Sequence, residues 1–144
     1  MYTTRTDERG RLKLPADFHN FVQNQEKKLF VTSLDRKTVR IYFLEAWRKN
    51  EALLTAQRGS QAAKNILFTA NELGAEVEMD PQGRVPLSAE LRAELQIANN
   101  QSVRLYHNSG RIEILSDSEY KSQREKAVAN PEADVHSMEE VGLL

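Results

Sequence analysis

The sequence contains no cysteine among its 144 residues, which excludes disulfide bonds and thiolate chemistry and suits a reducing cytoplasm. It shows no signal-peptide pattern and no apolar run long enough to span a bilayer, so no membrane partner is expected. Its three histidines, His19, His107 and His136, share no metal-ligand spacing. No glycine-rich phosphate loop and no set of nucleophile, base and orienting group is present, so we expect no cofactor, no metal and no enzymatic activity.

Charged and hydrophobic residues are present in the proportions of a globular domain, at 28% and 40%. The charge is divided unevenly along the chain. Residues 1–72 hold 13 Lys/Arg and 8 Asp/Glu, a net charge of +5, whereas residues 73–144 hold 7 and 13, a net charge of -6. This asymmetry favours a polyanionic partner on the basic side, the alternative being an ordinary solvated surface.

One short stretch of the sequence occurs twice. Residues 7–15 return 73 positions later as residues 80–88, and both copies have the form Asp-x-x-Gly-Arg-x-x-Leu. Similar residues continue at this spacing without a gap as far as Trp47 and Tyr120. We interpret the chain as a duplicated unit of roughly forty-five residues. Two units of that size would each bury too little surface alone, so the halves are expected to share one core.

The first copy of this stretch is predicted to form a tight turn followed by a strand. Asp7 bonds readily to its own backbone, and Gly10 accepts the positive φ that such a turn often needs. The next four residues alternate between polar and apolar, which is the period of a half-buried strand. Arg11 and Lys13 are therefore expected to share the exposed face of that strand.

A helical hairpin is expected after the remaining elements of the first half. These elements are a core-facing helix stripe of Phe18, Phe21 and Val22, a polar connector at 23–28, and strands at 29–32 and 39–43. The hairpin begins near Leu44 and has no visible counterpart in the second half, so we treat it as an insert. Its apolar residues exceed what one small domain can cover, which predicts a homo-oligomer. They are Trp47, Leu53, Leu54, Ile66, Leu67 and Phe68.

The patterns together predict an α+β, β-rich fold. The second half is expected to contain a strand at 75–79, a turn framed by Asp80 and Gly83, and a strand at 84–87 that lies at an edge or faces solvent at Pro86. Helices capped by Ser88 and Ser116, strands at 102–107 and 111–115, and a fraying acidic tail from about 130 are expected to follow. The predicted divisions are repeat 1 at 1–47, a helical linker at 48–73, repeat 2 at 74–121, and a C-terminal helix with the acidic tail at 122–144.

The doubled Asp-x-x-Gly-Arg turn, set between two strands and followed by a helix, resembles the MraZ family. Proteins of that family carry two tandem SpoVT-AbrB units, and the resemblance covers residues 1 to about 121. It implies that the repeats form one swapped-hairpin barrel within the chain. It also implies a sequence-specific transcriptional regulator that binds double-stranded DNA as a ring-shaped homo-oligomer. The expected target is a set of short direct repeats in the promoter of the division and cell-wall gene cluster, and the expected location is the cytoplasm, at the nucleoid.

The resemblance carries the family's Asp and Arg motif onto Asp7 and Arg11, and again onto Asp80 and Arg84. Arg11 corresponds to the arginine that contacts DNA. The residues themselves leave a second role open for both arginines, because each could simply form an ion pair with the aspartate of its own turn. Exposed pairs of that kind stabilise a protein by only about 0–1 kcal/mol, which explains a doubled motif poorly.

The neighbours of the two arginines predict that they contribute unequally. Arg9 and Lys13 flank Arg11 in the sequence, and an arginine in basic surroundings can contact phosphate or the acceptor edge of guanine. Gln82 and Pro86 stand at the matching positions around Arg84. We therefore expect a stronger DNA contact from Arg11 than from Arg84.

A function of a different class stays open at this point. Swapped-hairpin folds also serve as antitoxins, which hold a partner protein through a C-terminal tail. The acidic tail at 124–144 is compatible with that function, although such antitoxins are usually shorter and carry a single copy of the unit.

Overall fold

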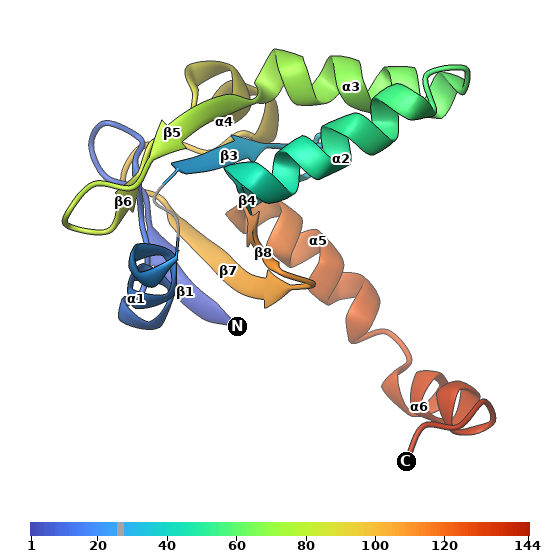
Figure 1. Cartoon of the computed structure of the whole chain (residues 1–144). Helices are drawn as coiled ribbons and strands as arrows, with labels where there is room; N and C mark the ends of the chain where they lie inside the picture. The colour runs from blue at the N-terminus through green and yellow to red at the C-terminus, as the bar shows by residue number, and fades with distance from the viewer. Residues whose placement is uncertain (26–27) are drawn as a thin grey trace.

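The computed structural model describes residues 1–25 and 28–144, over which six helices and eight strands form an α+β protein (Figure 1). The first half contains β1 (Tyr2–Arg5), β2 (Leu12–Lys13), α1 (Ala16–Asn24), β3 (Lys28–Thr32), β4 (Thr38–Phe43), α2 (Leu44–Ala56) and α3 (Gln61–Leu73). The second half contains β5 (Ala75–Glu78), β6 (Arg84–Val85), α4 (Ala89–Leu95), β7 (Ser102–Asn108), β8 (Arg111–Leu115), α5 (Asp117–Ala127) and α6 (Pro131–Glu139). The polar connector expected at 23–28 falls partly on 26–27, which lie outside the described residues.

The order of elements repeats, and most elements recur at the spacing found in the sequence. The expected match without a gap is wrong at β3 and β7: Val31 pairs with Ile41, whereas Leu105, 74 positions after Val31, pairs with Ile114. The series β1, β2, α1, β3, β4 and α2 is followed by β5, β6, α4, β7, β8 and α5. Helix α2 begins at Leu44 and α5 begins at Asp117, 73 positions later. The expectation that the whole helical hairpin is an insert is therefore wrong for α2. The correspondence was hard to see because the two helices share little beyond an aromatic residue at one position.

Local sequence signals account for where several elements begin and end. Ser60, Ser88 and Ser116 cap α3, α4 and α5, and each side-chain oxygen accepts the backbone N–H three residues on, at 3.4, 3.2 and 3.2 Å. Strand β6 stops at Val85, because Pro86 has no N–H to donate to a ladder. The caps predicted at Ser88 and Ser116 are thus confirmed, while the strand expected at 84–87 is shorter than predicted.

Strand exchange between the halves builds the main sheet. Its order is β1-β7-β8-β4-β3-β5, with every pairing antiparallel. The first strand of each half adds to the β-hairpin of the other half, so β1 pairs with β7 and β5 pairs with β3. Strands β2 and β6 pair with each other in a separate two-stranded ribbon. Over the described part of the chain these pairings give an open sheet and a ribbon, and they do not close into a ring of paired strands.

The core lies between the sheet, the ribbon and helices α1 and α4. Leucine and valine side chains from the ribbon meet β-branched side chains from β4 and β8 there. Val22 of α1 and Leu91 of α4 are fully buried in it. Each such side chain contributes about 1.5–3 kcal/mol when it is buried, so the core ties all four parts together. Phe21, which was expected in the core, is instead 39% exposed and lies on the surface side of α1.

A second apolar cluster joins α2 to the other face of the sheet. The Trp47 ring stacks on Phe30 with 4.6 Å between ring centroids and an interplanar angle of 12°. Trp47 is 3% exposed, so its expected place on a free apolar surface is wrong. Among the apolar residues of the hairpin, Leu53 and Phe68 are the two that stay largely exposed, at 63% and 66%. Leu54, Ile66 and Leu67 are partly buried, so the helices cover part of their own apolar surface.

Helix α6 projects away from the rest of the molecule (Figure 1). Every residue from 121 to 144 is exposed, including Val135, Met138 and Val141. The tail was expected to fray, and its residues form a helix that Pro131 opens at its first turn. Among the described residues, no helix combines the length and the apolar content needed to cross a bilayer.

An approximate twofold axis relates the halves and passes between β4 and β8. Arg40 and Glu113 lie 73 positions apart and pair with each other there, with Arg40 Nε 3.4 Å from Glu113 Oε1. Glu113 is 4% exposed, and it also accepts hydrogen bonds from Asn108 Nδ2 at 2.8 Å and Arg111 Nη2 at 3.4 Å. Burial raises the pKa of Glu113, but the hydrogen bonds from Asn108 and Tyr106 and the charges of Arg111 and Arg40 hold it below its usual value. A paired carboxylate therefore lies at the centre of the sheet.

Loss of this carboxylate should destabilise the fold. Glu113→Ala leaves Arg40 and Arg111 without the carboxylate that both pair with and should lower the free energy of unfolding by about 2–4 kcal/mol. Exchange of the two charges, Arg40→Glu with Glu113→Arg, should restore part of this loss, because the positions are equivalent and face each other. Urea unfolding at pH 7 measures both effects. Lys121→Ala, which breaks an exposed ion pair with Asp117, is the control and should change stability by under about 1 kcal/mol. A Glu113→Ala variant as stable as the unchanged chain would contradict the prediction.

The contribution of Glu113 should also depend on pH. Because folding lowers its pKa, the stabilisation is present above the unfolded value of about 4.3 and is lost as the pH falls through the folded value. The stability difference between the unchanged chain and Glu113→Gln should therefore be constant from about pH 5.5 to pH 7 and shrink below about pH 4. Urea unfolding across this range measures it, and a difference that grows on acidification would show that the carboxylate is not the charged partner.

Candidate functional site

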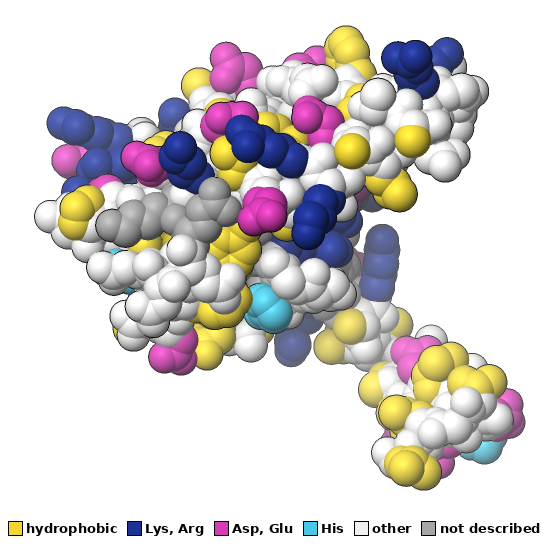
Figure 2. Space-filling model, in the orientation of Figure 1, with side chains coloured by type: hydrophobic (Ala, Val, Ile, Leu, Met, Phe, Trp, Pro, Cys, Tyr) yellow, Lys and Arg dark blue, Asp and Glu magenta, His cyan; other side chains and the backbone are white. Residues whose placement is uncertain are grey.

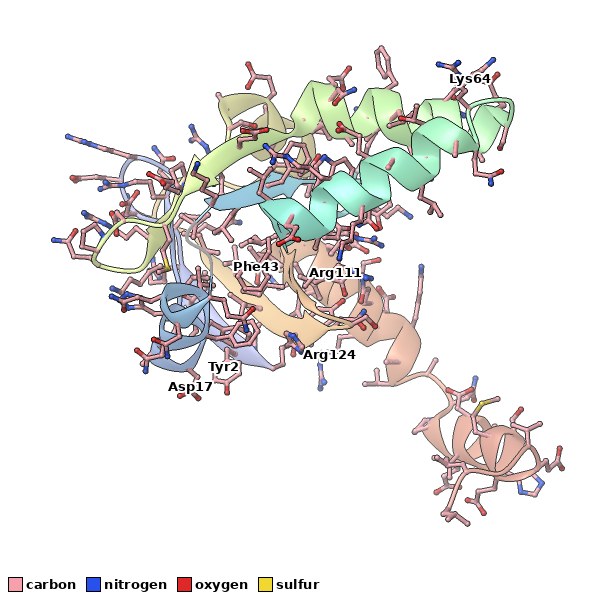
Figure 3. All side chains as sticks on the ribbon, in the orientation of Figure 1. Tyr2, Asp17, Phe43, Lys64, Arg111 and Arg124 are labelled. Carbon is pink, nitrogen blue, oxygen red and sulfur yellow. The ribbon has the colours of Figure 1, made fainter. Side chains whose placement is uncertain are left out.

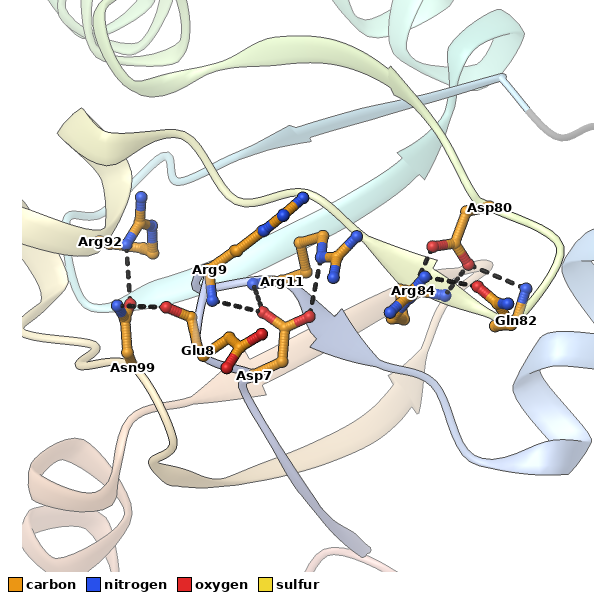
Figure 4. Close-up of polar contacts among 9 residues, drawn as sticks. All are labelled: Asp7, Glu8, Arg9, Arg11, Asp80, Gln82, Arg84, Arg92 and Asn99. Atoms are coloured by element: carbon orange, nitrogen blue, oxygen red, sulfur yellow. Dashed lines mark hydrogen bonds and ion pairs between the residues drawn. The ribbon is translucent and has the colours of Figure 1, made fainter.

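The two Asp-x-x-Gly-Arg turns lie at opposite ends of the β2–β6 ribbon (Figure 4). The strands are antiparallel, with Leu12 opposite Val85 and Lys13 opposite Arg84. Leu12 and Val85 are 73 positions apart, so the twofold axis of the sheet also passes through the ribbon. Both side chains are fully buried. The ribbon is therefore fixed to the core, and the turns extend from a rigid base.

Asp7 organises the first turn through its carboxylate. Its Oδ1 atom accepts the backbone N–H groups of Arg9 and Arg11 at 2.9 and 2.8 Å, and its Oδ2 atom accepts the Nε–H of Arg11 at 2.7 Å. The Gly10 N–H donates to the Asp7 carbonyl at 3.0 Å, and the Asp7 N–H donates to the Arg11 carbonyl at 2.8 Å. Gly10 has φ 75°, which would strain any residue with a side chain. One carboxylate thus holds both the backbone of the turn and its arginine.

The second turn has the same construction. The Asp80 carboxylate accepts the N–H groups of Gln82 and Arg84, each at 2.9 Å, and the Nε–H of Arg84 at 2.7 Å. Gly83 has φ 77° and donates to the Asp80 carbonyl at 3.0 Å. The geometry of the motif is therefore reproduced at both ends of the ribbon.

The two carboxylates are held in their charged form. Partial burial raises the pKa of each aspartate, but the backbone N–H groups and the arginine of its own turn lower it further, so both pKa values lie below the usual range. Asp7 and Asp80 are consequently ionised at neutral pH, and each arginine is oriented by a full negative charge.

Arg11 and Arg84 differ in the donors that stay available. Their side chains are 26% and 32% exposed, and each uses its Nε atom within its own turn. Arg84 also donates from Nη2 to the Gln82 side chain. Within residues 1–25 and 28–144, the two Nη atoms of Arg11 have no hydrogen-bond partner. Arg11 therefore forms the ion pair with Asp7 through Nε. Its two Nη atoms, the outer fork of the guanidinium, stay available for a planar acceptor.

The cations expected beside Arg11 are divided between the turns. Leu12 and Leu14 are buried while Lys13 is exposed, so the predicted alternation along this strand is confirmed. Lys13 nevertheless pairs with Arg84 and donates from Nζ to the backbone carbonyl of the second turn. Strand β2 runs from the first turn toward the second, so Lys13 lies beside the second turn while Arg11 stays within the first. Arg9 is exposed on the first turn, and Figure 2 shows Lys and Arg side chains gathered at that end of the molecule.

Two further residues contact the turns and were missed in the sequence. The Arg92 side chain of α4 lies against Gly10, and the His19 ring of α1 lies against Gly83. Positions 19 and 92 are also 73 apart, so each half covers the glycine of the other half's turn from the same place on its helix. The repeat spacing was the one available signal. It gave no sign of contact, because a histidine and an arginine at matching positions suggest no shared role.

Other parts of the chain offer less to a ligand. Over the residues that the structure describes, no group of three or more His, Asp or Glu side chains is placed to hold a metal ion. An open pocket of about 230 Å³ lies beside Tyr2, Asp17 and Phe18, where the Tyr2 hydroxyl donates to the Asp17 carboxylate at 3.3 Å (Figure 3). This pocket is on the α1 side of the sheet edge and shares no residue with the two turns.

Comparison with known proteins identifies the family. No protein-family profile matches the chain. A protein of Acidobacterium capsulatum named Transcriptional regulator MraZ is 36% identical over 144 residues, which covers 99% of this chain and 97% of that protein. A protein of the same name from Koribacter versatilis is 37% identical over 105 residues, which covers 71% of each chain. Another from Actinobacillus pleuropneumoniae is 27% identical over 120 residues, which covers 81% of this chain and 78% of that protein. The doubled turn and this identity along nearly the whole length lead to one conclusion: the chain belongs to the MraZ family.

Proposed function

We propose that this chain is a transcriptional regulator that binds double-stranded DNA in a sequence-specific manner through the two turns of the β2–β6 ribbon. The observation that carries the proposal is the outer fork of Arg11, held in place by an ionised aspartate and left without a partner in the described chain. The names of the relatives support the same function, since each is called a transcriptional regulator.

The chemistry of the site suits the major groove. A two-stranded ribbon fits the width of that groove, and an arginine fork binds the O6 and N7 acceptors of guanine through two parallel hydrogen bonds. Asp7 holds the Nε atom, so the Arg11 guanidinium loses little rotational freedom when the outer nitrogens bind. Arg9 and Lys13 supply charge for phosphates on either side. Arg84 would bind more weakly, because Gln82 occupies one of its outer nitrogens.

The proposal extends to the assembly and its target. We place the chain in a ring-shaped homo-oligomer that binds short direct repeats in the promoter of the division and cell-wall gene cluster, at the nucleoid in the cytoplasm. Strand exchange between the halves supports the swapped-hairpin architecture of the two SpoVT-AbrB units. The exposed Leu53 and Phe68 and the projecting α6 provide surface for subunit contacts. Several weak DNA contacts on one ring would add to a high overall affinity.

One observation favours a second function, a module that holds a partner protein through its tail. Helix α6 carries apolar side chains that are all exposed, and a helix of nine residues is marginal in water without a partner. Co-purification of a stoichiometric partner protein, combined with no retention of the chain's own promoter fragment on a gel, would support this second function over DNA binding.

Arg11 variants should separate DNA contact from a structural role. Arg11→Ala should weaken binding to the chain's own promoter fragment by about tenfold to a hundredfold, which is the value of one bidentate contact to a base. Arg11→Lys should also bind poorly, because an ammonium group cannot replace a planar fork. Arg84→Ala should lose less. Gel shift and melting temperature are measured on the same samples.

Arg124→Ala is the matched control, since it removes one exposed arginine from α5, far from the ribbon (Figure 3). It should leave both affinity and melting temperature unchanged. The Arg11→Ala variant should melt close to the unchanged chain, because an exposed ion pair contributes only about 0–1 kcal/mol. If Arg11→Ala melts normally and binds at full strength, Arg11 does not read the DNA.

Binding should weaken steeply with salt. Each phosphate that the ribbon neutralises should add about -0.9 to the slope of log affinity against log salt concentration. Lys13→Ala should therefore reduce the steepness by about 0.9 for each subunit engaged, whereas Lys121→Ala on α5 should not change it. Fluorescence anisotropy with a labelled promoter fragment between about 50 and 200 mM salt measures the slope, and a flat response would count against direct DNA binding.

A further inference from the structure

The Arg92 guanidinium braces the first turn from the second half of the chain. Its Nε atom donates to the Leu87 carbonyl at 3.1 Å, and its Nη1 atom donates to Asn99 Oδ1 at 3.1 Å. The side chain lies so close to Gly10 that a Cβ atom there would overlap its Nη1, Cζ and Cδ atoms. The missing side chain of Gly10 thus permits the Arg92 side chain to lie directly against the turn.

Asn99 connects this arginine to the turn. While its Oδ1 atom accepts from Arg92, its Nδ2 atom donates to the Glu8 carbonyl at 2.8 Å. The neighbouring Asn100 N–H donates to the Asp7 carbonyl at 3.2 Å. One side chain therefore links α4 to the outer part of the turn, and the adjacent backbone reaches the inner part.

The loop that carries Asn99 is itself fixed to the first half. Thr6, which is 2% exposed, donates from Oγ1 to the Ala98 carbonyl at 2.7 Å and accepts the Gln101 N–H at 3.0 Å. The Gln101 side chain in turn accepts the Ala98 N–H at 2.8 Å. Asn99 is consequently held between two anchored neighbours, so it presents its amide to Glu8 in one orientation.

We propose that Arg92 is a positioning residue for DNA recognition, acting through Asn99 and through its contact with Gly10 to hold the Asp7–Arg11 turn in its binding conformation. The inference depends on the proposed function for the identity of the ligand, but the brace itself exists without DNA. Two of the Arg92 nitrogens are already used within the protein, which suits support of the turn. Binding then requires less ordering of the turn, and the affinity gained comes from this preorganisation.

The matching residue at the other turn provides a weaker brace. The His19 ring lies against Gly83, but its buried Nε2 atom has no hydrogen-bond partner in the described part of the chain. Arg92 contributes two hydrogen bonds and a bridge where His19 contributes contact alone. The first turn, with the free Arg11 fork, is thus also the turn with the stronger support.

The brace can be tested without DNA by amide hydrogen exchange. In Asn99→Ala and in Arg92→Ala, the backbone amides of Arg9, Gly10 and Arg11 should exchange about fivefold to tenfold faster than in the unchanged chain, as expected for the loss of one hydrogen bond. The equivalent amides of the second turn, at 82, 83 and 84, serve as the internal control and should not change. Unchanged exchange at the first turn in both variants would overturn the proposal.

The consequence for DNA is tested with the promoter fragment and its salt slope. Both variants should bind about fivefold to tenfold more weakly with an unchanged slope, and the double variant should be no weaker than either single one. Arg124→Ala should bind normally. If Arg92→Ala lowers the slope by about 0.9 while Asn99→Ala binds normally, Arg92 contacts a phosphate directly and the positioning role is wrong. If the unchanged chain binds no DNA but the exchange rates respond as expected, the proposed function fails while the brace remains.

Discussion

The pairing of each half's first strand with the other half's β-hairpin is the constraint on which the rest of the structure depends. Since β1 completes the sheet beside β7 and β5 completes it beside β3, neither half can form its own sheet edge alone. The chain that leaves each of these strands must cross the axis between the halves. The β2–β6 ribbon forms at this crossing and carries a turn at each end. The position of the candidate site is therefore a direct result of how the halves exchange strands.

In each turn, one aspartate carboxylate fixes the conformation of the loop. Asp7 and Asp80 satisfy two backbone N–H groups and one arginine each, with nearly identical distances. The two turns differ at the Nη atoms of their arginines. Arg84 Nη2 donates to the Gln82 side chain, whereas no described residue accepts from the Nη atoms of Arg11. The fold thus builds the two turns alike, and the neighbouring residues make their arginines differ in the donors that stay available.

Sequence reasoning recovered the parts of the structure that depend on local chemistry. The turns, the serine caps and the alternation around Leu12 all follow from residues a few positions apart. It could not recover which strands pair across the halves, because alternation gives a strand's faces and not its neighbours. Trp47 was misjudged for the same reason: its partner Phe30 lies on a distant strand, and only the packed fold shows that their rings stack. The link from Arg92 to the first turn also joins residues about eighty positions apart.

The charge pair on the axis has a consequence for how the chain avoids pairing with the wrong partner. If a first half met the first half of another chain through β4, two copies of Arg40 would face each other where Glu113 now lies. If two second halves met through β8, two buried carboxylates would be juxtaposed instead. Like charges directly opposite on a sheet are destabilising, and burial makes the repulsion stronger. Only unlike halves fit at this position, so the charge pair disfavours assemblies in which two first halves or two second halves meet.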